Sequence, residues 1–225
     1  KFIATGHYVR AKAGKLFVAK DENKDQSYFL WTLKKKVVAK CLFPIGEYAK
    51  PEVRKLAKKF GLPNHAKKDS QGVCFIGPLD MKDFLKSHIK PKSGKIIDKN
   101  GRRVGTHDGV TYYTIGQRHG LNITNGQGPY FVISKDVKKN IIYVGSEKDL
   151  GKNEMRVSGV SFVSEKLKFP AKVDIKIRYR SKSIPAFIRN SKFLIQFLKP
   201  ARAVTEGQSA VFYRGNEMLG GGVII

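Results

Sequence analysis

Short alternating strands are the feature of this sequence that most constrains its fold. From about Lys92 onward, apolar and aromatic residues alternate with polar ones and are punctuated by turn signals such as Asn100-Gly101, the preferred two-residue hairpin turn. After about Met155 this pattern occupies residues 173–180, 193–197 and 209–213. Such closely spaced strands favour a small closed or nearly closed β-barrel at the end of the chain.

The first part of the chain has a different pattern, in which helix and strand signals alternate. Residues 1–8 read as the end of a buried strand running into a loop, and residues 8–19 as a hairpin. Residues 25–33 have apolar side chains at helical spacing, with Phe29 among them, and residues 50–61 have a proline start and a glycine end. These patterns predict an α/β segment.

Three domains are therefore expected. Residues 1–88 form the C-terminal part of an α/β domain, residues 89–150 a central β-rich module, and residues 151–225 the C-terminal β-barrel. Because the opening strand has neither an initiating Met nor a preceding turn, we expect the chain to be a fragment of a longer protein.

Charge is the strongest compositional signal. The 44 Lys and Arg residues against 18 Asp and Glu give a formal net charge of +26, which favours a polyanionic partner, most often nucleic acid. The alternative is a lysine-biased genome, but such bias usually raises the acidic residues as well. No apolar run is long enough for a membrane helix and no signal peptide pattern is present, so we expect a cytoplasmic protein with no membrane partner.

The two cysteines can serve only a few structural or chemical roles. They are too few for a disulfide framework and have no paired C-x-x-C spacing for zinc. Cys74 lies in DSQGVCFIG, between two glycines and just after two lysines, where its thiolate could be stabilised. Spacing alone leaves open whether Cys74 is a reactive thiol or an apolar residue filling a core.

Other candidate residues are equally open when taken one at a time. Gly6 and His7 follow an apolar strand, where open α/β sheets bind ligands, yet His7 could equally pack against the next loop. The triplet Lys24-Asp25-Gln26 falls at a helix entrance, although most such runs are solvated surface. Arg178-Tyr179-Arg180, predicted on a strand with Tyr179 facing away from both arginines, suits RNA contact by stacking and phosphate binding.

Several segments together resemble one family, in the same order and from one end of the chain to the other. They are ATGHYVR (4–10), DENKDQSYFL (21–30), LFPIGEYAKPEVRKLAKKFGL (42–62), KKDSQGVCFIG (67–77), TIGQRHGL (114–121), IRYR (177–180) and EGQSAVFY (206–213). This set is similar to the tRNA-specific 2-thiouridylase family of bacteria and organelles. The resemblance implies an ATP-pyrophosphatase (PP-loop) domain, a small central module and a C-terminal β-barrel.

The resemblance also implies a reaction and its partners. ATP, with Mg²⁺, would activate O2 of the wobble uridine in tRNAs for Glu, Gln and Lys, and a cysteine persulfide would then deliver sulfur to C2. A sulfur-donor protein of a persulfide relay would load that cysteine. We expect the parent protein to act as a monomer.

Individual roles carry over onto matching positions of this sequence. Cys74 corresponds to the catalytic cysteine that bears the persulfide, and Gly6 to an ATP-contacting glycine. The tRNA contacts correspond to His7, Lys24, Asp25, Gln26, Arg178, Tyr179 and Gln208. No metal ligand carries over, and Cys41 stands where the family requires no thiol.

Two further expectations concern what the sequence lacks. The family's SGGxDSS phosphate loop and its second catalytic cysteine, the disulfide partner of the persulfide cysteine, belong upstream of ATGHY, so the chain alone is expected to be inactive. The alternative is a non-catalytic, basic RNA-binding fragment. A small-molecule thiol enzyme is a third reading, but it needs a base near Cys74, and nothing in the sequence directs His65 toward that thiol.

Overall fold

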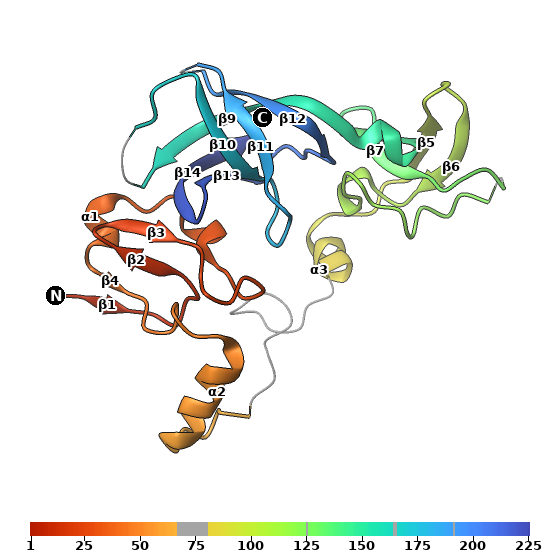
Figure 1. Ribbon diagram of the computed structural model, residues 1–225. Helices are drawn as coiled ribbons and strands as arrows, with labels where there is room; N and C mark the ends of the chain where they lie inside the picture. Colours follow the sequence, from red (N-terminus) through yellow and green to blue (C-terminus); the bar gives the residue numbers. More distant parts are fainter. Residues whose placement is uncertain (67–80, 125, 164–165, 191) are drawn as a thin grey trace. The chain divides into compact units, whose positions relative to one another are not determined.

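The structure is a computed structural model that describes residues 1–66, 81–124, 126–163, 166–190 and 192–225 (Figure 1). The chain divides into two compact units. The first comprises Lys1–Lys67, Asn153–Ala201 and Thr205–Ile225, and the second comprises Lys68–Lys152 and Arg202–Val204. Among the described residues, no helix is both long and apolar enough to cross a membrane.

A closed β-barrel dominates the first unit. Its strands are β9 (Gly151–Phe162), β10 (Ala171–Lys176), β11 (Ile184–Ile188), β12 (Leu194–Arg202), β13 (Ser209–Arg214) and β14 (Glu217–Ile224). They follow the order β13-β10-β11-β12-β9-β14, and an antiparallel pairing of β13 with β14 closes the sheet. Alternate residues of β10 point inward, and Ile175, Ile188 and Ile195 are fully buried.

The barrel sheet extends into the N-terminal segment. There β2 (Arg10–Lys12) and β3 (Lys15–Phe17) form a hairpin, and β3 pairs with the first two residues of β14. The following residues of β14 pair with β9 instead. One strand therefore joins the hairpin to the barrel.

The rest of the N-terminal segment is a small α/β arrangement. Strands β1 (Ile3–Ala4) and β4 (Cys41–Leu42) pair in parallel. Helix α1 (Lys35–Val38) precedes β4 in the chain, and helix α2 (Lys50–Lys59) follows it. The predicted burial of the first strand is wrong, since Ile3 is 66% exposed and β4 is its only partner among the described residues.

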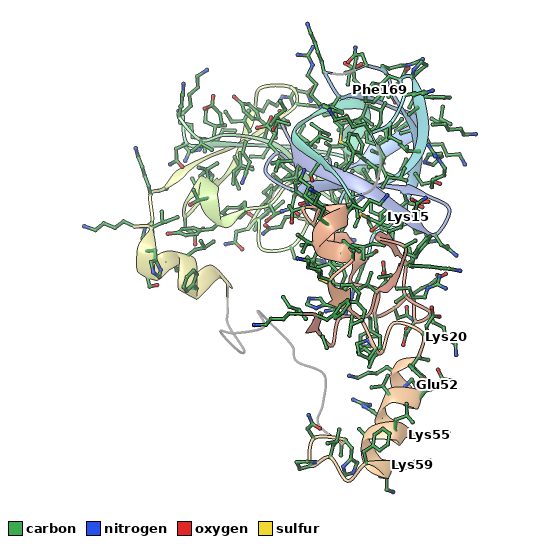
Figure 2. The ribbon with its side chains drawn as sticks, turned by 90° about the vertical axis from the view of Figure 1, so that its left-hand side faces the viewer. Lys15, Lys20, Glu52, Lys55, Lys59 and Phe169 are labelled. Carbon is green, nitrogen blue, oxygen red and sulfur yellow. The ribbon has the colours of Figure 1, made fainter. Side chains whose placement is uncertain are left out.

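Helix α2 begins and ends as the sequence predicts. Pro51 occupies its first turn, and Gly61 follows its end with a φ of +67°. Glu52 accepts a hydrogen bond from the backbone N–H of Ala49 and forms an ion pair with Lys20, which holds the pKa of Glu52 below its usual range. Figure 2 shows Lys20 and Glu52 beside each other, with Lys55 and Lys59 further along α2.

A hydrophobic cluster packs the N-terminal segment against the barrel within the first unit. Leu16 of β3, Trp31 and Tyr28 lie against Tyr213 of β13 and Met218 of β14. Trp31 also donates a hydrogen bond from Nε1 to Ser209 Oγ over 3.1 Å. These contacts join residues that are about 180 positions apart in the chain.

The second unit is a β-rich module. Its strands are β5 (Gly94–Asp98), β6 (Arg103–His107), β7 (Phe131–Asp136) and β8 (Ile141–Gly145), preceded by helix α3 (Met81–His88) and interspersed with 3-10 turns η2 (Val110–Tyr112) and η3 (Glu147–Leu150). The sheet order is β6-β5-β8-β7, and β5 pairs with β8 in parallel. Asp98 Oδ1 accepts hydrogen bonds from the backbone N–H groups of Asn100 and Arg102, which fixes the predicted Asn-Gly turn.

The predicted fold class is confirmed: an α/β segment, a β-rich central module and a C-terminal β-barrel. Sequence patterns did not predict β9, β11 or β14. The domain boundaries placed at residues 88 and 150 remain predictions.

Candidate nucleic-acid interface

Two hydrogen bonds join Gln26 to the backbone of Tyr8, the residue after His7, and together form a clamp. The backbone N–H of Tyr8 donates to Gln26 Oε1 over 2.9 Å, and the backbone N–H of Gln26 donates to the carbonyl of Tyr8, also over 2.9 Å. Thr5 Oγ1 hydrogen-bonds to His7 Nδ1. The clamp fixes the backbone of Tyr8, directly after the half-buried His7, so Gln26 helps to position this histidine.

Asp25 is buried and fully engaged. Only 5% of it is exposed, and its carboxylate accepts hydrogen bonds from the backbone N–H groups of Ala19 and Ser27 and from Ser27 Oγ. Lys176 Nζ lies 3.5 Å from Asp25 Oδ2 and 5.0 Å from the centre of the Tyr213 ring. A buried carboxylate needs such partners, and here they tie the triplet at residues 24–26 to strand β10.

Lys24, in contrast, lines an open pocket of about 850 Å³ within the first unit. Four of the pocket residues are cationic: Lys24, Lys176, Arg180 and Lys182. Glu22 is the acidic residue of the lining. An excess of cations on a concave surface favours an anionic ligand such as a phosphate backbone.

The segment Arg178-Tyr179-Arg180 corrects a prediction. Strand β10 ends at Lys176, and the three residues form a turn instead of continuing the strand. Arg180 has a φ of +61°, and Ser181 donates from Oγ to the carbonyl of Arg178 over 2.8 Å. The left-handed residue reverses the chain, so the Arg180 guanidinium lies over the Tyr179 ring, 5.2 Å from its centre, instead of on the opposite face.

Arg178 connects this turn to the segment that carries Gln208. Its Nη2 donates to Thr205 Oγ1 over 2.9 Å, and the backbone N–H of Gln208 in turn donates to the carbonyl of Thr205. Gln208 is exposed. Tyr28 donates from its hydroxyl to the carbonyl of the next residue, Ser209, over 2.8 Å.

Two buried tyrosines brace this arrangement. Burial raises the pKa of Tyr28 and, more strongly, that of Tyr213. Both phenols therefore stay protonated and can donate hydrogen bonds. Tyr213 Oη lies 3.1 Å from Ser27 Oγ, which extends the network around Asp25 into the barrel.

Residues 24–29 thus join the predicted contact residues into one region of the first unit. Gln26 reaches the backbone of Tyr8 beside His7, Asp25 reaches β10, and the aromatic residues after Ser27 reach Tyr179. Sequence reasoning missed Lys176, Lys182 and Phe29 as parts of this region. Only Lys176 had a usable signal, the alternation within Val173–Ile177, whereas the other two depend on tertiary contacts.

The sequence has two cysteines, Cys41 and Cys74. Cys74 lies outside the described residues. Cys41 is a half-buried free thiol on β4 that donates to the carbonyl of Val37 over 3.3 Å. It follows α1 and pairs with Ile3 of β1, and its lack of a catalytic part stays a prediction.

Gly6 has open space around its backbone. It is exposed at the carboxyl end of β1, and a Cβ atom built on it would meet nothing within 4 Å. That open space fits close approach of a ligand to the backbone, at the edge where α/β sheets bind nucleotides. Within the described part of the chain, no group of three His, Cys, Asp or Glu residues could hold a metal ion.

Comparison with known proteins places these features in context. Family models match three consecutive stretches: the tRNA methyl transferase HUP domain at residues 1–78, the tRNA methyl transferase PRC-barrel domain at residues 82–146, and the aminomethyltransferase β-barrel domain at residues 152–224. The class defined by this fold and site is thus a multidomain protein with a nucleotide-binding-type α/β domain and two β-rich domains.

Curated relatives give the family. The chain is 43% identical to the tRNA-specific 2-thiouridylase MnmA of Geobacillus thermodenitrificans, 42% to that of Photorhabdus laumondii and 40% to that of Streptococcus sanguinis, each over 99% of its length. It belongs to the tRNA-specific 2-thiouridylase family. The chain spans 63%, 65% and 64% of the length of these three relatives.

Proposed function

We propose that this chain is the tRNA-binding and sulfur-carrying part of an enzyme that thiolates C2 of the wobble uridine in tRNA. Identity of 40–43% to 2-thiouridylases over 99% of the chain carries the proposal. The region that contains Lys24, Arg178 and Gln208 supports it, because its basic pocket and the exposed amide of Gln208 suit phosphate and base contacts.

Cys74 is the sulfur carrier in this proposal. The terminal sulfur of its persulfide forms a bond to C2 of the activated uridine, and the bond from C2 to its activated oxygen breaks. A partner thiolate then attacks Cys74 Sγ, which breaks the sulfur–sulfur bond. The products are 2-thiouridine, AMP, which carries away the oxygen from C2, and a disulfide, so the two cysteines are oxidised as the transferred sulfur is reduced.

The remaining residues bind and orient the RNA. His7, Lys24, Gln26, Arg178, Tyr179 and Gln208 contact tRNA, while Asp25 acts by holding Lys24 and Gln26 in place. When bound, ATP supplies the leaving group at O2, and Gly6 lets it approach the backbone closely. Magnesium accompanies its phosphates.

Several finer assignments belong to the same proposal. The substrates are tRNAs for Glu, Gln and Lys, a persulfide-relay protein donates the sulfur, and the enzyme acts as a cytoplasmic monomer. The α/β domain ends near residue 88 and the central module near residue 150.

The decisive experiment replaces each thiol in turn in the full-length parent protein. With ATP, a sulfur donor and unmodified tRNA, Cys74→Ser should lower 2-thiouridine formation at least a thousandfold, because no serine can carry a persulfide. Nucleoside mass spectrometry measures the product.

Cys41→Ser is the matched control, since it removes a thiol that donates a hydrogen bond to the carbonyl of Val37. It should retain wild-type activity. Normal thiolation by Cys74→Ser would overturn the assignment of the sulfur carrier.

The second candidate is an RNA-binding fragment without catalysis, favoured by the net charge of +26 and the basic pocket. Persulfide formation on Cys74 in the 225-residue chain would distinguish the two. A chain that binds RNA but never accepts sulfur from a donor supports the second candidate.

A further inference from the structure

Phe29 is an exposed aromatic residue whose neighbours hold it outward. Residues Ser27–Leu30 form a 3-10 helix, in which positions three apart share a face. Tyr28 and Trp31 occupy the buried face, at 7% and 9% exposure, and both are hydrogen-bonded to Ser209. Phe29 consequently points away from the core and is 52% exposed.

This geometry differs from the α-helical spacing predicted for residues 25–33, which would place Phe29 on an apolar face with Leu30 and Leu33. Rotating the helix to bury Phe29 would break both hydrogen bonds to Ser209 and remove Trp31 from the core cluster. The exposure of Phe29 is therefore fixed by the fold.

Phe29 is paired with Tyr179 from the turn after β10. Their ring centres lie 4.5 Å apart at an interplanar angle of 48°, and Phe29 contacts Tyr28 edge-on at 5.5 Å. The Arg180 guanidinium lies 5.2 Å from the centre of the Tyr179 ring. Two aromatic rings and one planar cation thus cluster on the surface of the first unit.

The aromatic cluster shares Arg180 with the basic pocket. Arg180 lines the 850 Å³ pocket together with Lys24 and Lys182. A ligand that fits both features has a flat apolar part and a negatively charged backbone close by. Nucleotides in single-stranded RNA have this chemistry, and their unstacked bases bind to aromatic rings and arginine planes.

We propose that Phe29, Tyr179 and Arg180 form a stacking site for a nucleobase that has left the stack of an RNA loop. The inference rests on the proposed function in that the RNA is the tRNA substrate, and it adds Phe29 and Arg180 to the contact residues. Phosphates next to the stacked base enter the basic pocket.

The test compares a loop with a duplex. The probes are a 17-nucleotide RNA hairpin with a seven-nucleotide loop containing 2-aminopurine, and a blunt RNA duplex of similar charge. Phe29→Ala in the 225-residue chain should weaken hairpin binding about tenfold to a hundredfold, the usual loss for one base–aromatic stack. It should also abolish the 2-aminopurine quenching, and it should leave duplex binding unchanged, since paired bases stay stacked.

Two variants serve as controls. Phe29→Tyr keeps an aromatic ring and should retain affinity and quenching, while Phe60→Ala removes another exposed aromatic, on the residue after α2, and should change neither. A melting temperature within a few degrees of wild type shows that Phe29→Ala folds, as expected for a half-exposed side chain.

The outcomes separate the two proposals. If the wild-type chain binds the hairpin and Phe29→Ala binds it equally well with the same quenching, the stacking site is overturned and the proposed function stands. If Phe29→Ala loses hairpin binding while Cys74→Ser still thiolates, the stacking site stands and the sulfur carrier is overturned. Absence of any RNA binding by the wild-type chain overturns both.

Discussion

At the residue scale, adjacent side chains of one motif have different physical situations. Lys24 lines the basic pocket, and Asp25 is buried and paired with Lys176. Gln26 accepts a hydrogen bond from the backbone N–H of Tyr8, beside His7. The resemblance assigns all three to tRNA contact. Lys24 lines the basic pocket, where a ligand can reach it, whereas Asp25 is buried, so in the proposed site we assign Asp25 a positioning part.

This difference predicts that Asp25→Ala mainly lowers stability and that Lys24→Ala mainly weakens RNA binding. Asp25→Ala should lower the free energy of unfolding by about 2–4 kcal/mol, because it leaves Lys176 and two buried N–H groups without their carboxylate. Lys24→Ala should cost less than about 1 kcal/mol yet weaken RNA binding. Urea unfolding followed by the fluorescence of Trp31, the only tryptophan in the sequence, measures the first quantity.

Glu22→Ala is the matched control, because it removes one carboxylate from the same turn at an exposed position. It should leave stability nearly unchanged. A stable Asp25→Ala variant with weakened RNA binding would contradict the positioning part and make Asp25 a direct contact.

At the element scale, strand β14 decides how the first unit is assembled. Its residues Gly220, Gly221 and Gly222 lie where β9, β13 and Trp31 converge on the strand. A Cβ on Gly220 would lie 2.1 Å from the carbonyl oxygen of Ser161, and the φ of this residue is +154°. Only glycine fits at such a point of close backbone approach.

Gly220→Ala should therefore destabilise the first unit by at least about 3 kcal/mol, through loss of the β14–β9 pairing as well as backbone strain. Thermal unfolding followed by circular dichroism checks this. Gly215→Ala is the control, since its φ of +56° is also positive but no atom lies within 4 Å of an added Cβ. It should cost only about 1–2 kcal/mol, and equal costs for both would refute the steric explanation.

At the scale of the whole molecule, charge is the dominant property. A net charge of +26 produces attraction to any polyanion, so affinity alone does not identify a partner. The distribution of cations is more informative, because several cations in the first unit are already paired with carboxylates. One example is Lys15, which is labelled in Figure 2. Its Nζ lies 3.1 Å from Glu217 Oε1.

RNA affinity should fall steeply with salt, by about tenfold to a hundredfold between 50 and 200 mM, if the three pocket cations other than Lys176, which is paired with Asp25, each neutralise one phosphate. Lys182→Ala should lower the slope of log affinity against log salt by about one. Fluorescence anisotropy titrations with tRNA at several salt concentrations measure both quantities.

Lys15→Ala, which removes a cation already paired with Glu217, should leave the slope unchanged. An affinity that does not depend on salt would sink the assignment of the basic pocket to phosphate binding. Equal slope changes for Lys15→Ala and Lys182→Ala would mean that the charge acts diffusely and not through the pocket.

Local sequence signals determined much of the molecule. The structure confirms four features that follow from the preferences of a few neighbouring residues. They are the ends of α2, the turn at Asn100-Gly101, the hairpin at residues 8–19 and the β-rich character of the chain after Lys92. The order of motifs was sufficient to give the family. The excess of lysine and arginine gave the expectation of a polyanionic partner.

Tertiary structure alone decided which side chains of those motifs are available to a ligand. The burial of Asp25 and the outward position of Phe29 depend on partners about 150 to 180 residues away, at Lys176, Ser209 and Tyr179. Periodicity specifies which residues share a face, but long-range pairing specifies which face is covered. For that reason the sequence determined the family and the local elements, while only the folded first unit showed which residues are buried in its interior and which are exposed to a ligand.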